Sequence, residues 1–236
     1  MRADGRTDDA LRPVTIEIEK NIHAEGSCLI SVGGTQVLCV ATVEEEIPSF
    51  LRGSGKGWVT AEYSMLPRAT HTRMKRERRE VGGRTMEIQR LIARSLRAVV
   101  DQALLGERTI TVDCDVIQAD GGTRCASITG AYVALRQAMN WLMEKDRIGR
   151  MPLKDQVAAV SVGVGPRGPL LDLDYREDSS AHVDMNIVLT GSGKFVEIQG
   201  TAEAEPFDEE TMGRMVALAR KGTAHLFEIQ RRAVRH

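Results

Sequence analysis

The sequence predicts an α+β fold with mixed sheets, and three observations lead to this prediction. Apolar and polar residues alternate in short runs near the N-terminus and again in the second half of the chain, which is the period of a half-buried strand. Two long stretches in the middle carry apolar residues at helical spacing. A third helical stretch ends the chain. Strands, then helices, then strands, then a helix indicate an α+β arrangement.

The expected elements follow one another in two blocks. The first block opens with antiparallel strands, because Gly33-Gly34 between two strand-like runs is a hairpin signal. The last helix starts just after Pro206, a residue that commonly flanks helix ends. The expected strands are residues 14–20, 27–32, 36–43, 58–66, 109–118, 157–165, 170–175, 185–190 and 194–200, and the expected helices are 84–104, 125–145 and about 208 to the C-terminal end.

Length and composition set the class of protein. The chain has 236 residues, 42% of them hydrophobic, and we expect residues 1–236 to form a single domain. No stretch approaches the ~20 consecutive apolar residues of a membrane helix, and the N-terminus lacks the apolar centre of a signal peptide, so we expect a cytoplasmic protein. The four cysteines show no C-x-x-C spacing, and we expect them to be reduced and structural rather than in disulfides or a zinc site.

A basic segment, residues 68–97, interrupts an otherwise near-neutral chain. It holds ten basic and three acidic residues, a net charge of +7, whereas the whole chain has a formal net charge of −1. Such a concentration of charge indicates an anionic polymer or phosphate as a partner. A solvated charged loop is the alternative reading.

Two glycine-rich stretches resemble nucleotide-binding loops without meeting their requirements. G-S-G-K occurs at 53–56 and at 191–194, but a P-loop needs G-x4-G-K-[S/T], and both stretches lack the first glycine and the final hydroxyl residue. The histidines do not have zinc-site spacing either. We interpret both stretches as turns.

The sequence D-G-G-T-R at 120–124 lies where a strand-like run gives way to a helical one. Glycines permit close backbone approach, and the amides of Gly122, Thr123 and Arg124 would point into the N-terminus of the helix, where the helix dipole favours an anion. The Thr123 hydroxyl and the Arg124 guanidinium add donors that match phosphate oxygens. Arg84 follows a second pair of glycines at the start of the preceding helix. Together they predict a site for a ligand the size of orthophosphate.

The helix that begins near Arg84 has two faces. Apolar residues form one continuous stripe between Ile88 and Val100. Helical geometry places Arg84 near this stripe, so we expect its side chain to point inward, toward either a bound anion or a buried acid. The opposite face is either a cationic row or a solvated surface, and it carries Arg90, Arg94 and Arg97.

Acidic residues gather between 172 and 184. Phosphate chemistry that uses magnesium needs carboxylates, and Mg²⁺ takes only one or two of them while it keeps several waters. Asp184 directly precedes an apolar strand-like run, so we expect it to be held rigidly. A polar loop with ordinary solvated acids is the alternative. The acids are Asp172, Asp174, Glu177, Asp178 and Asp184.

These residues together resemble the ribonuclease PH family, the phosphate-dependent 3′ exoribonucleases of bacteria. The resemblance rests on Arg84, on G-T-R at 122–124, on Asp178 with Asp184, and on the stretches GWVTAEYSMLPRATHTR and EIQRLIARSLRA. It covers nearly the whole chain, from R-A-D-G-R near the N-terminus to the last helix.

The resemblance implies a ribonuclease PH fold, a βαβα domain with mixed sheets and packed helices, and a homo-hexamer built as a trimer of dimers. It implies that the protein trims the 3′ ends of tRNA precursors, with inorganic phosphate as co-substrate and Mg²⁺ as cofactor, and releases nucleoside diphosphates. The implied phosphate-binding residues are Arg84, Gly122, Thr123 and Arg124, and the implied catalytic and metal-binding residues are Asp178 and Asp184. The resemblance implies that arginines of the 68–79 loop bind the RNA: Arg68, Arg73, Arg76, Arg78 and Arg79. The cationic row of the helix adds Arg90, Arg94 and Arg97 to the predicted RNA-binding residues.

Two other functions compete with this one. A ring subunit that kept the fold and lost the chemistry would lack the phosphate-binding arginines or the aspartates, and all of them are present. A magnesium-dependent phosphotransferase acting on nucleotides would use the anion site and the acids but leave the basic segment without a role.

Overall fold

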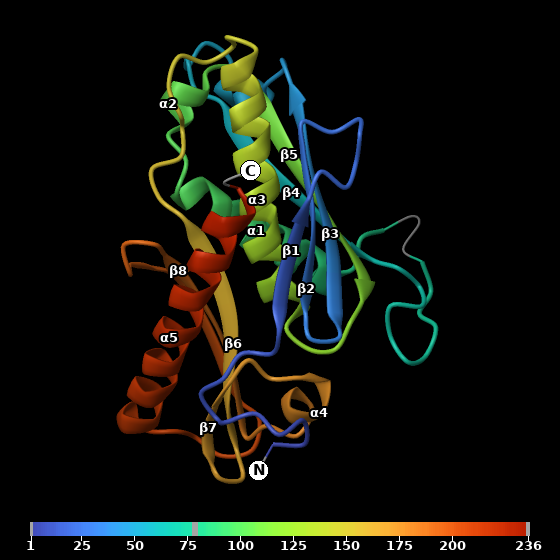
Figure 1. The fold of residues 1–236 in the computed structure, drawn as a ribbon, viewed down its shortest axis with the longest axis vertical. Coiled ribbons are helices and arrows are strands. Elements are labelled where there is room, and N and C mark those ends of the chain that lie inside the picture. Colours follow the sequence, from blue (N-terminus) through green and yellow to red (C-terminus); the bar gives the residue numbers. More distant parts are fainter. Residues whose placement is uncertain (1, 77–79, 235–236) are drawn as a thin grey trace.

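The computed structural model describes residues 2–76 and 80–234, which form two β-sheets with helices between and beside them (Figure 1). The predicted α+β class is confirmed. The strands are β1 (Val14–Ile18), β2 (Gly26–Val32), β3 (Thr35–Glu44), β4 (Trp58–Met65), β5 (Thr109–Gln118), β6 (Val157–Gly165), β7 (Gly168–Leu171), β8 (Val183–Thr190) and β9 (Phe195–Ala202). The helices are α1 (Gly83–Ala98), α2 (Gln102–Leu105), α3 (Thr123–Glu144), α4 (Tyr175–Asp178) and α5 (Glu209–Ala233), with a short 3₁₀ turn at Ser49–Leu51.

The first sheet has five strands in the order β1-β2-β3-β5-β4. β4 runs parallel to β5 while the other neighbours are antiparallel, so this sheet is mixed as predicted. Val32 pairs with Thr35 across the Gly33-Gly34 turn, which confirms the predicted hairpin. Residues along β3 alternate between buried and partly exposed, because one face of the sheet is covered by helices and the other is open.

The second sheet has four antiparallel strands in the order β7-β6-β8-β9. Nearly every residue of β6 and β8 is buried, which explains why these strands appear in the sequence as continuous apolar runs. β9 lies at the edge and is largely exposed. Helix α5 packs against β6 and β7, and Figure 1 shows it lying along this sheet.

Helix α3 lies at the centre of the molecule. It packs against β2 and β3 of the first sheet and against β6 of the second, and most of its residues are buried (Figure 1). A helix that is apolar on nearly all sides is stable only in such an enclosed position. The largest apolar cluster joins the first sheet, α1 and α3 to Val157, Ala159 and Val188 of the second sheet. The N-terminus of α3 therefore emerges at the junction of the two sheets.

Two predicted element boundaries are wrong. The helix predicted over 84–104 ends at Ala98, and the Asp101 carboxylate then accepts hydrogen bonds from the amides of Ala103 and Leu104, which starts the separate helix α2. The strand predicted over 170–175 ends at Leu171. A capping box between Asp174 and Glu177 starts α4 where the strand was expected to continue.

All four cysteines are buried free thiols. Cys28, Cys39 and Cys114 lie opposite one another on β2, β3 and β5, under α3. Within the described residues, no helix has both the length and the apolar character that crossing a membrane requires.

Candidate active site

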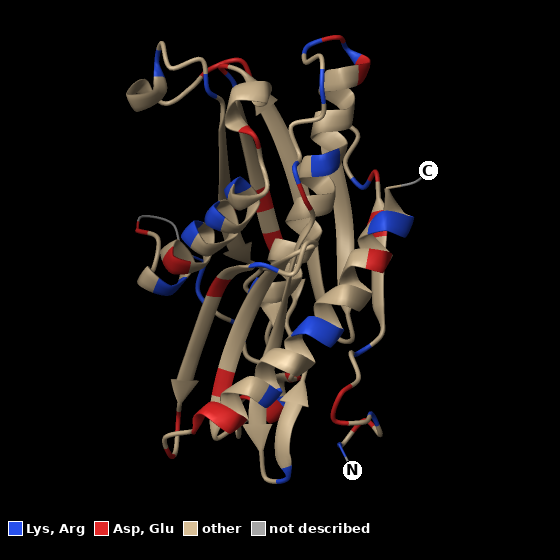
Figure 2. Cartoon of the chain, turned by 90° about the vertical axis from the view of Figure 1, so that its left-hand side faces the viewer, with Lys and Arg blue, Asp and Glu red and all other residues tan. Residues whose placement is uncertain are grey.

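A cavity of about 860 Å³ opens where the two sheets meet. α1 and the start of α3 form one wall, and α4, β8 and β9 form the other. It contains all six residues that the sequence predicts for phosphate and metal chemistry: Arg84, Gly122, Thr123, Arg124, Asp178 and Asp184. Figure 2 shows basic residues recurring along α1 and acidic residues on neighbouring elements.

We call the side of the cavity formed by α1 and the start of α3 the basic wall, because it carries Arg84 and Arg124. The 120–124 turn lies at its base. Gly121 and Gly122 have φ angles of +76° and +66°, in the left-handed region that favours glycine, and Gly122 is the N-cap of α3. α3 has 22 residues, so its N-terminus presents free backbone amides and the positive end of a long dipole. This arrangement suits a phosphate group in the cavity.

Side chains from distant parts of the chain orient the two polar residues of this turn. The Thr123 hydroxyl shares a 2.9 Å hydrogen bond with the Tyr63 hydroxyl. The Arg124 guanidinium donates to the Gln199 amide oxygen at 3.0 Å and lies 3.7 Å from the Glu87 carboxylate. The Gln199 amide also donates to Glu87, at 3.0 Å. A guanidinium held by neutral and acidic partners is pre-organised to receive an anion on its remaining donors.

The position of Arg84 differs from the predicted one. The residue is exposed and lines the open cavity at the first turn of α1, so the expected inward position beside the apolar stripe is wrong. Because Arg84 is exposed, it does not form the salt bridge to a buried acid that was one of its two expected interactions. Its charge still acts on the cavity, because Arg84 opposes the rise in the pKa of both Asp178 and Asp184.

Asp178 and Asp184 form the acidic wall. Burial raises the pKa of Asp184 to about 6, the nearby Asp178 adds to the rise, and Arg124 opposes it. Burial also raises the pKa of Asp178, against the influence of Arg124 and Arg84. The Oδ1 atom of Asp184 is buried and has no hydrogen-bond partner among the described residues. An unpaired buried carboxylate oxygen is costly, so this atom is suited to a cation or a proton.

The two aspartates fit a magnesium ion. Mg²⁺ binds proteins through one or two carboxylates and fills its other positions with water and substrate oxygens. In the described part of the chain, no group of three or more His, Cys, Asp or Glu side chains is placed to hold a metal. Asp178 on α4 and Asp184 on β8 would therefore share the ion with phosphate groups.

Several residues of the cavity and its surroundings were not predicted. Asn186 accepts a hydrogen bond from the Cys125 thiol, and Glu203 raises the pKa of both aspartates, after burial and the larger influences. Tyr63, Glu87 and Gln199 support the basic wall through their bonds to Thr123 and Arg124. These five residues come from separate elements or loops, and no local motif connects them to the turn. Only their meeting in space reveals their role.

Among the predicted RNA-binding arginines that the structure describes, none lines this cavity. Arg73 and Arg76 are exposed, and Arg78 and Arg79 lie outside the described residues. On α1, Arg90 is exposed, and Arg94 forms an ion pair with Glu197 of β9 at 2.7 Å. Arg97 is half-buried with its guanidinium carbon 4.2 Å from the centre of the Trp58 ring.

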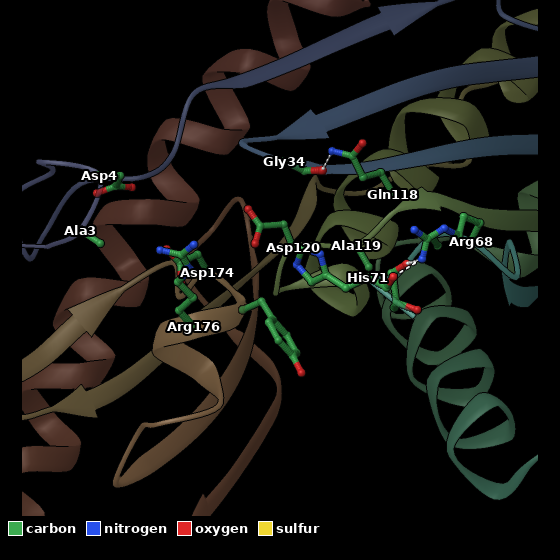
Figure 3. A pocket seen from close by; sticks show the side chains of 13 residues that line it. Ala3, Asp4, Gly34, Arg68, His71, Gln118, Ala119, Asp120, Asp174 and Arg176 are labelled. Carbon is green, nitrogen blue, oxygen red and sulfur yellow. Dashed lines mark hydrogen bonds between the residues drawn. The ribbon is translucent and has the colours of Figure 1, made fainter. Parts of the chain in front are cut away.

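A second pocket, of about 560 Å³, lies beside Asp120, the first residue of the D-G-G-T-R turn (Figure 3). Asp120 and Asp174 line it, together with Arg68, Arg176 and His71. The His71 ring is 6.3 Å from the ring of Tyr175, the first residue of α4. The turn and α4 each contribute residues to both pockets.

Models of one protein family match both halves of the chain. Residues 10–139 match the model of the RNase PH 3′ exoribonuclease family, domain 1, and residues 155–222 match domain 2. Solved structures that share the fold include one from rice and two from archaea. Rrp46 from rice (Oryza sativa) is 19% identical with a TM-score of 0.79, and 98% of each chain is covered.

The other two structures are archaeal. An Archaeoglobus fulgidus exosome with RNA bound to the active site is 23% identical with a TM-score of 0.79, covering 96% of this chain and 91% of that one. An archaeal exosome core is 20% identical with a TM-score of 0.76, covering 97% and 91%. At these identities the likeness shows the fold.

Proposed function

This chain belongs to the RNase PH 3′ exoribonuclease family, and from that premise we propose that it is a phosphorolytic enzyme that trims the 3′ ends of tRNA precursors. Inorganic phosphate would be the co-substrate and nucleoside diphosphates the products. One observation supports phosphorolysis most strongly: the basic wall and the two aspartates face a single cavity. A ring subunit that only binds RNA would not need this arrangement.

The proposed reaction is a displacement at the last phosphodiester of the RNA. An oxygen of inorganic phosphate forms a bond to the phosphorus, and the bond between that phosphorus and the 3′ oxygen of the preceding nucleotide breaks. The preceding nucleotide keeps this oxygen, which takes up a proton, and the terminal nucleotide leaves as a diphosphate. The protein's task is alignment and neutralisation of charge, as in other phosphoryl transfers.

Each wall of the cavity has a part in this step. Arg84, Arg124 and the amides at the start of α3 bind the attacking phosphate and reduce its repulsion from the anionic backbone. Asp178 would hold Mg²⁺, which supplies a positive charge next to the reacting oxygens. Asp184 either shares that ion or, with its raised pKa, gives a proton to the departing 3′ oxygen.

RNA capture would fall to the exposed arginines of residues 68–76 and of α1. Single exposed contacts to phosphate are weak, so several copies around one channel would bind a structured RNA better than one copy. We therefore propose a homo-hexamer, arranged as a trimer of dimers, with a cytoplasmic location. The relation of the fold to exosome cores, one of them with RNA at its active site, supports a ring that binds RNA.

The function is tested by incubating the protein with a 3′-extended tRNA, with and without added phosphate. We expect trimming only with phosphate, release of diphosphates, and extension of the RNA when nucleoside diphosphate is in excess. An Arg150→Gln variant, changed at an exposed arginine between α3 and β6, should behave as the unaltered protein. Equal trimming in phosphate-free buffer with release of monophosphates would refute phosphorolysis.

Assembly has its own test. Light scattering under assay conditions should give the mass of six chains. A variant held as a dimer should keep phosphate binding yet process structured tRNA poorly, while it still degrades short unstructured RNA. A monodisperse dimer that trims tRNA precursors at the full rate per active site would show that the ring is not needed for RNA capture.

A further inference from the structure

The N-terminal segment, residues 2–12, lies beside β7 and α4, and it carries three arginines for which no role is predicted from the sequence (Figure 1). Arg2 donates two hydrogen bonds to the Glu177 carboxylate of α4. Arg6 donates to the backbone oxygen of Asp172, and the side chain of Arg12 is 4% exposed. Buried arginines are rare unless a specific set of partners holds them.

Arg12 binds the carboxylate of Asp172 with a fork geometry. Its Nε donates to Oδ2 at 3.0 Å, its Nη2 donates to Oδ1 at 2.7 Å, and its backbone amide donates to Oδ2 at 2.7 Å. Asp172 has a φ of +55°, unusual for a residue with a side chain, and it connects β7 to α4. These bonds therefore fix the backbone that leads into the helix carrying Asp178.

The same guanidinium also reaches the phosphate-binding turn. Its Nη1 donates to the backbone oxygen of Asp120, and its Nη2 lies 3.4 Å from the backbone oxygen of Gly121 in a further hydrogen bond. Thr35 holds the turn from the opposite direction, since its hydroxyl accepts from the Asp120 amide at 2.8 Å and donates to the Gly121 oxygen at 2.7 Å. One buried charge thus bonds to the segment that leads into each wall of the cavity, Asp120-Gly121 before α3 and Asp172 before α4.

The packing leaves little room for these two parts to shift. A Cβ on Gly121 would lie 2.6 Å from the backbone carbon of Asp174, so the turn already touches the start of α4. A Cβ on Gly33 would lie 2.6 Å from the Arg12 side chain, so the β2–β3 turn covers the stem of this arginine. Loss of the guanidinium would remove the side-chain donor of the Asp120 carbonyl oxygen and of Asp172 Oδ1, which is costly for buried acceptors.

We propose that Arg12 is a positioning residue: it fixes the distance between the phosphate-binding turn and the helix that carries Asp178. The inference rests on the proposed function, because the two walls must be aligned for phosphate to attack the RNA. Displacement of reacting groups by about 1 Å can cost on the order of 10²-fold in rate. Lysine at this position would keep the charge but could not form the fork and reach the turn together.

The test compares Arg12→Lys with a matched control. Gln230 is also fully buried, and its side chain donates to the backbone oxygens of Thr129 and Val157, so it joins α5 to α3 and β6 away from the cavity. Gln230→Leu should lower the Tm and leave the KM for phosphate unchanged. Arg12→Lys should raise the KM for phosphate about 10-fold or more and lower kcat, with the KM for RNA unchanged.

A second readout does not depend on turnover. Inorganic phosphate should raise the Tm of the unaltered protein, and this rise should be much smaller in Arg12→Lys and in Asp172→Asn, a variant that keeps the shape of the partner. If the unaltered protein binds phosphate but shows no phosphate-dependent trimming, the proposed function fails while this test still stands. An unchanged KM or Tm rise for phosphate in either soluble variant would overturn the inference.

Discussion

Arginines occur both at the cavity and on the exposed basic segment, but the protein holds them in different ways. Arg124 is bonded to Gln199 beside Glu87 at the N-terminus of a buried helix, and Arg12 lies buried behind the same turn. Arg73 and Arg76 are exposed. We propose that the two groups have different tasks: pre-organised groups act in the chemical step, whereas solvated groups add affinity through their number.

Removal of a cavity arginine should have the largest effect. Arg124→Ala should lower kcat by on the order of 10²-fold or more and raise the KM for phosphate, because it removes a pre-organised donor from the attacking anion. Steady-state kinetics with varied phosphate measures both. A change confined to the affinity for RNA would reverse the assignment of the two groups of arginines.

Asp184→Asn should raise the stability of the protein at high pH. The folded-state pKa of Asp184 is raised to about 6 by burial and by Asp178, so ionisation above that pH disfavours the folded state, and stability falls as pH rises from about 4 through 6. In Mg²⁺-free buffer at pH 8 the variant should therefore have a Tm higher by about 2 to 4 °C, for a gain of about 1 kcal/mol after solvent screening.

This gain should disappear near pH 4, where Asp184 of the unaltered protein is protonated. Calorimetry over this pH range is the measurement, and Asp155→Asn, changed at a partly exposed acid in the loop before β6, is the control. A variant less stable than the unaltered protein at pH 8 would show that the Asp184 carboxylate is not strained in the fold.

Substitution of an exposed arginine should have a moderate effect, on RNA binding and not on kcat. Arg73→Ala or Arg76→Ala should weaken RNA binding and reduce the slope of log affinity against log salt by about 0.7 to 0.9 for each RNA phosphate that the variant no longer neutralises. The kcat at saturating RNA should not change. Fluorescence anisotropy at several salt concentrations measures the slope. A fall in kcat equal to that of Arg124→Ala would remove the distinction between the two regions.

Substitution of Arg94 on α1 should have the smallest effect on stability. Arg94 is mostly exposed and pairs with Glu197, and such surface pairs contribute about 0 to 1 kcal/mol. Arg94→Ala should therefore change the free energy of unfolding by less than about 1 kcal/mol. If its RNA affinity falls while Arg220→Ala, changed at an arginine of α5, keeps full affinity, the predicted RNA contact of α1 is supported.

Much of this arrangement is visible in the sequence because it is local. Two adjacent glycines before a helix indicate the D-G-G-T-R turn, and alternation indicates the strands. The break in the helix after Ala98 is hidden in the sequence, because a single Asp101 cap decides it while the apolar spacing continues. The position of Arg84 is mispredicted because periodicity alone contains no information about a cavity beside the first turn.

The supporting residues could not be predicted for a related reason. Arg12 and Asp172 are 160 positions apart, and Gln199 and Arg124 are 75 apart. Each is an ordinary polar residue in its local sequence, and its role exists only once the two sheets meet at α3. Long-range pairs of this kind carry no periodic signal.

The central claim is that phosphate bound in the cavity becomes part of the product, and isotope transfer tests it directly. The protein would be incubated with a 3′-extended tRNA and orthophosphate labelled with ³²P. We expect the label to appear in the β-phosphate of the released nucleoside diphosphates, and Arg124→Ala to lower its rate of appearance. Label that stays in orthophosphate while unlabelled nucleoside monophosphates are released would rule out phosphorolysis.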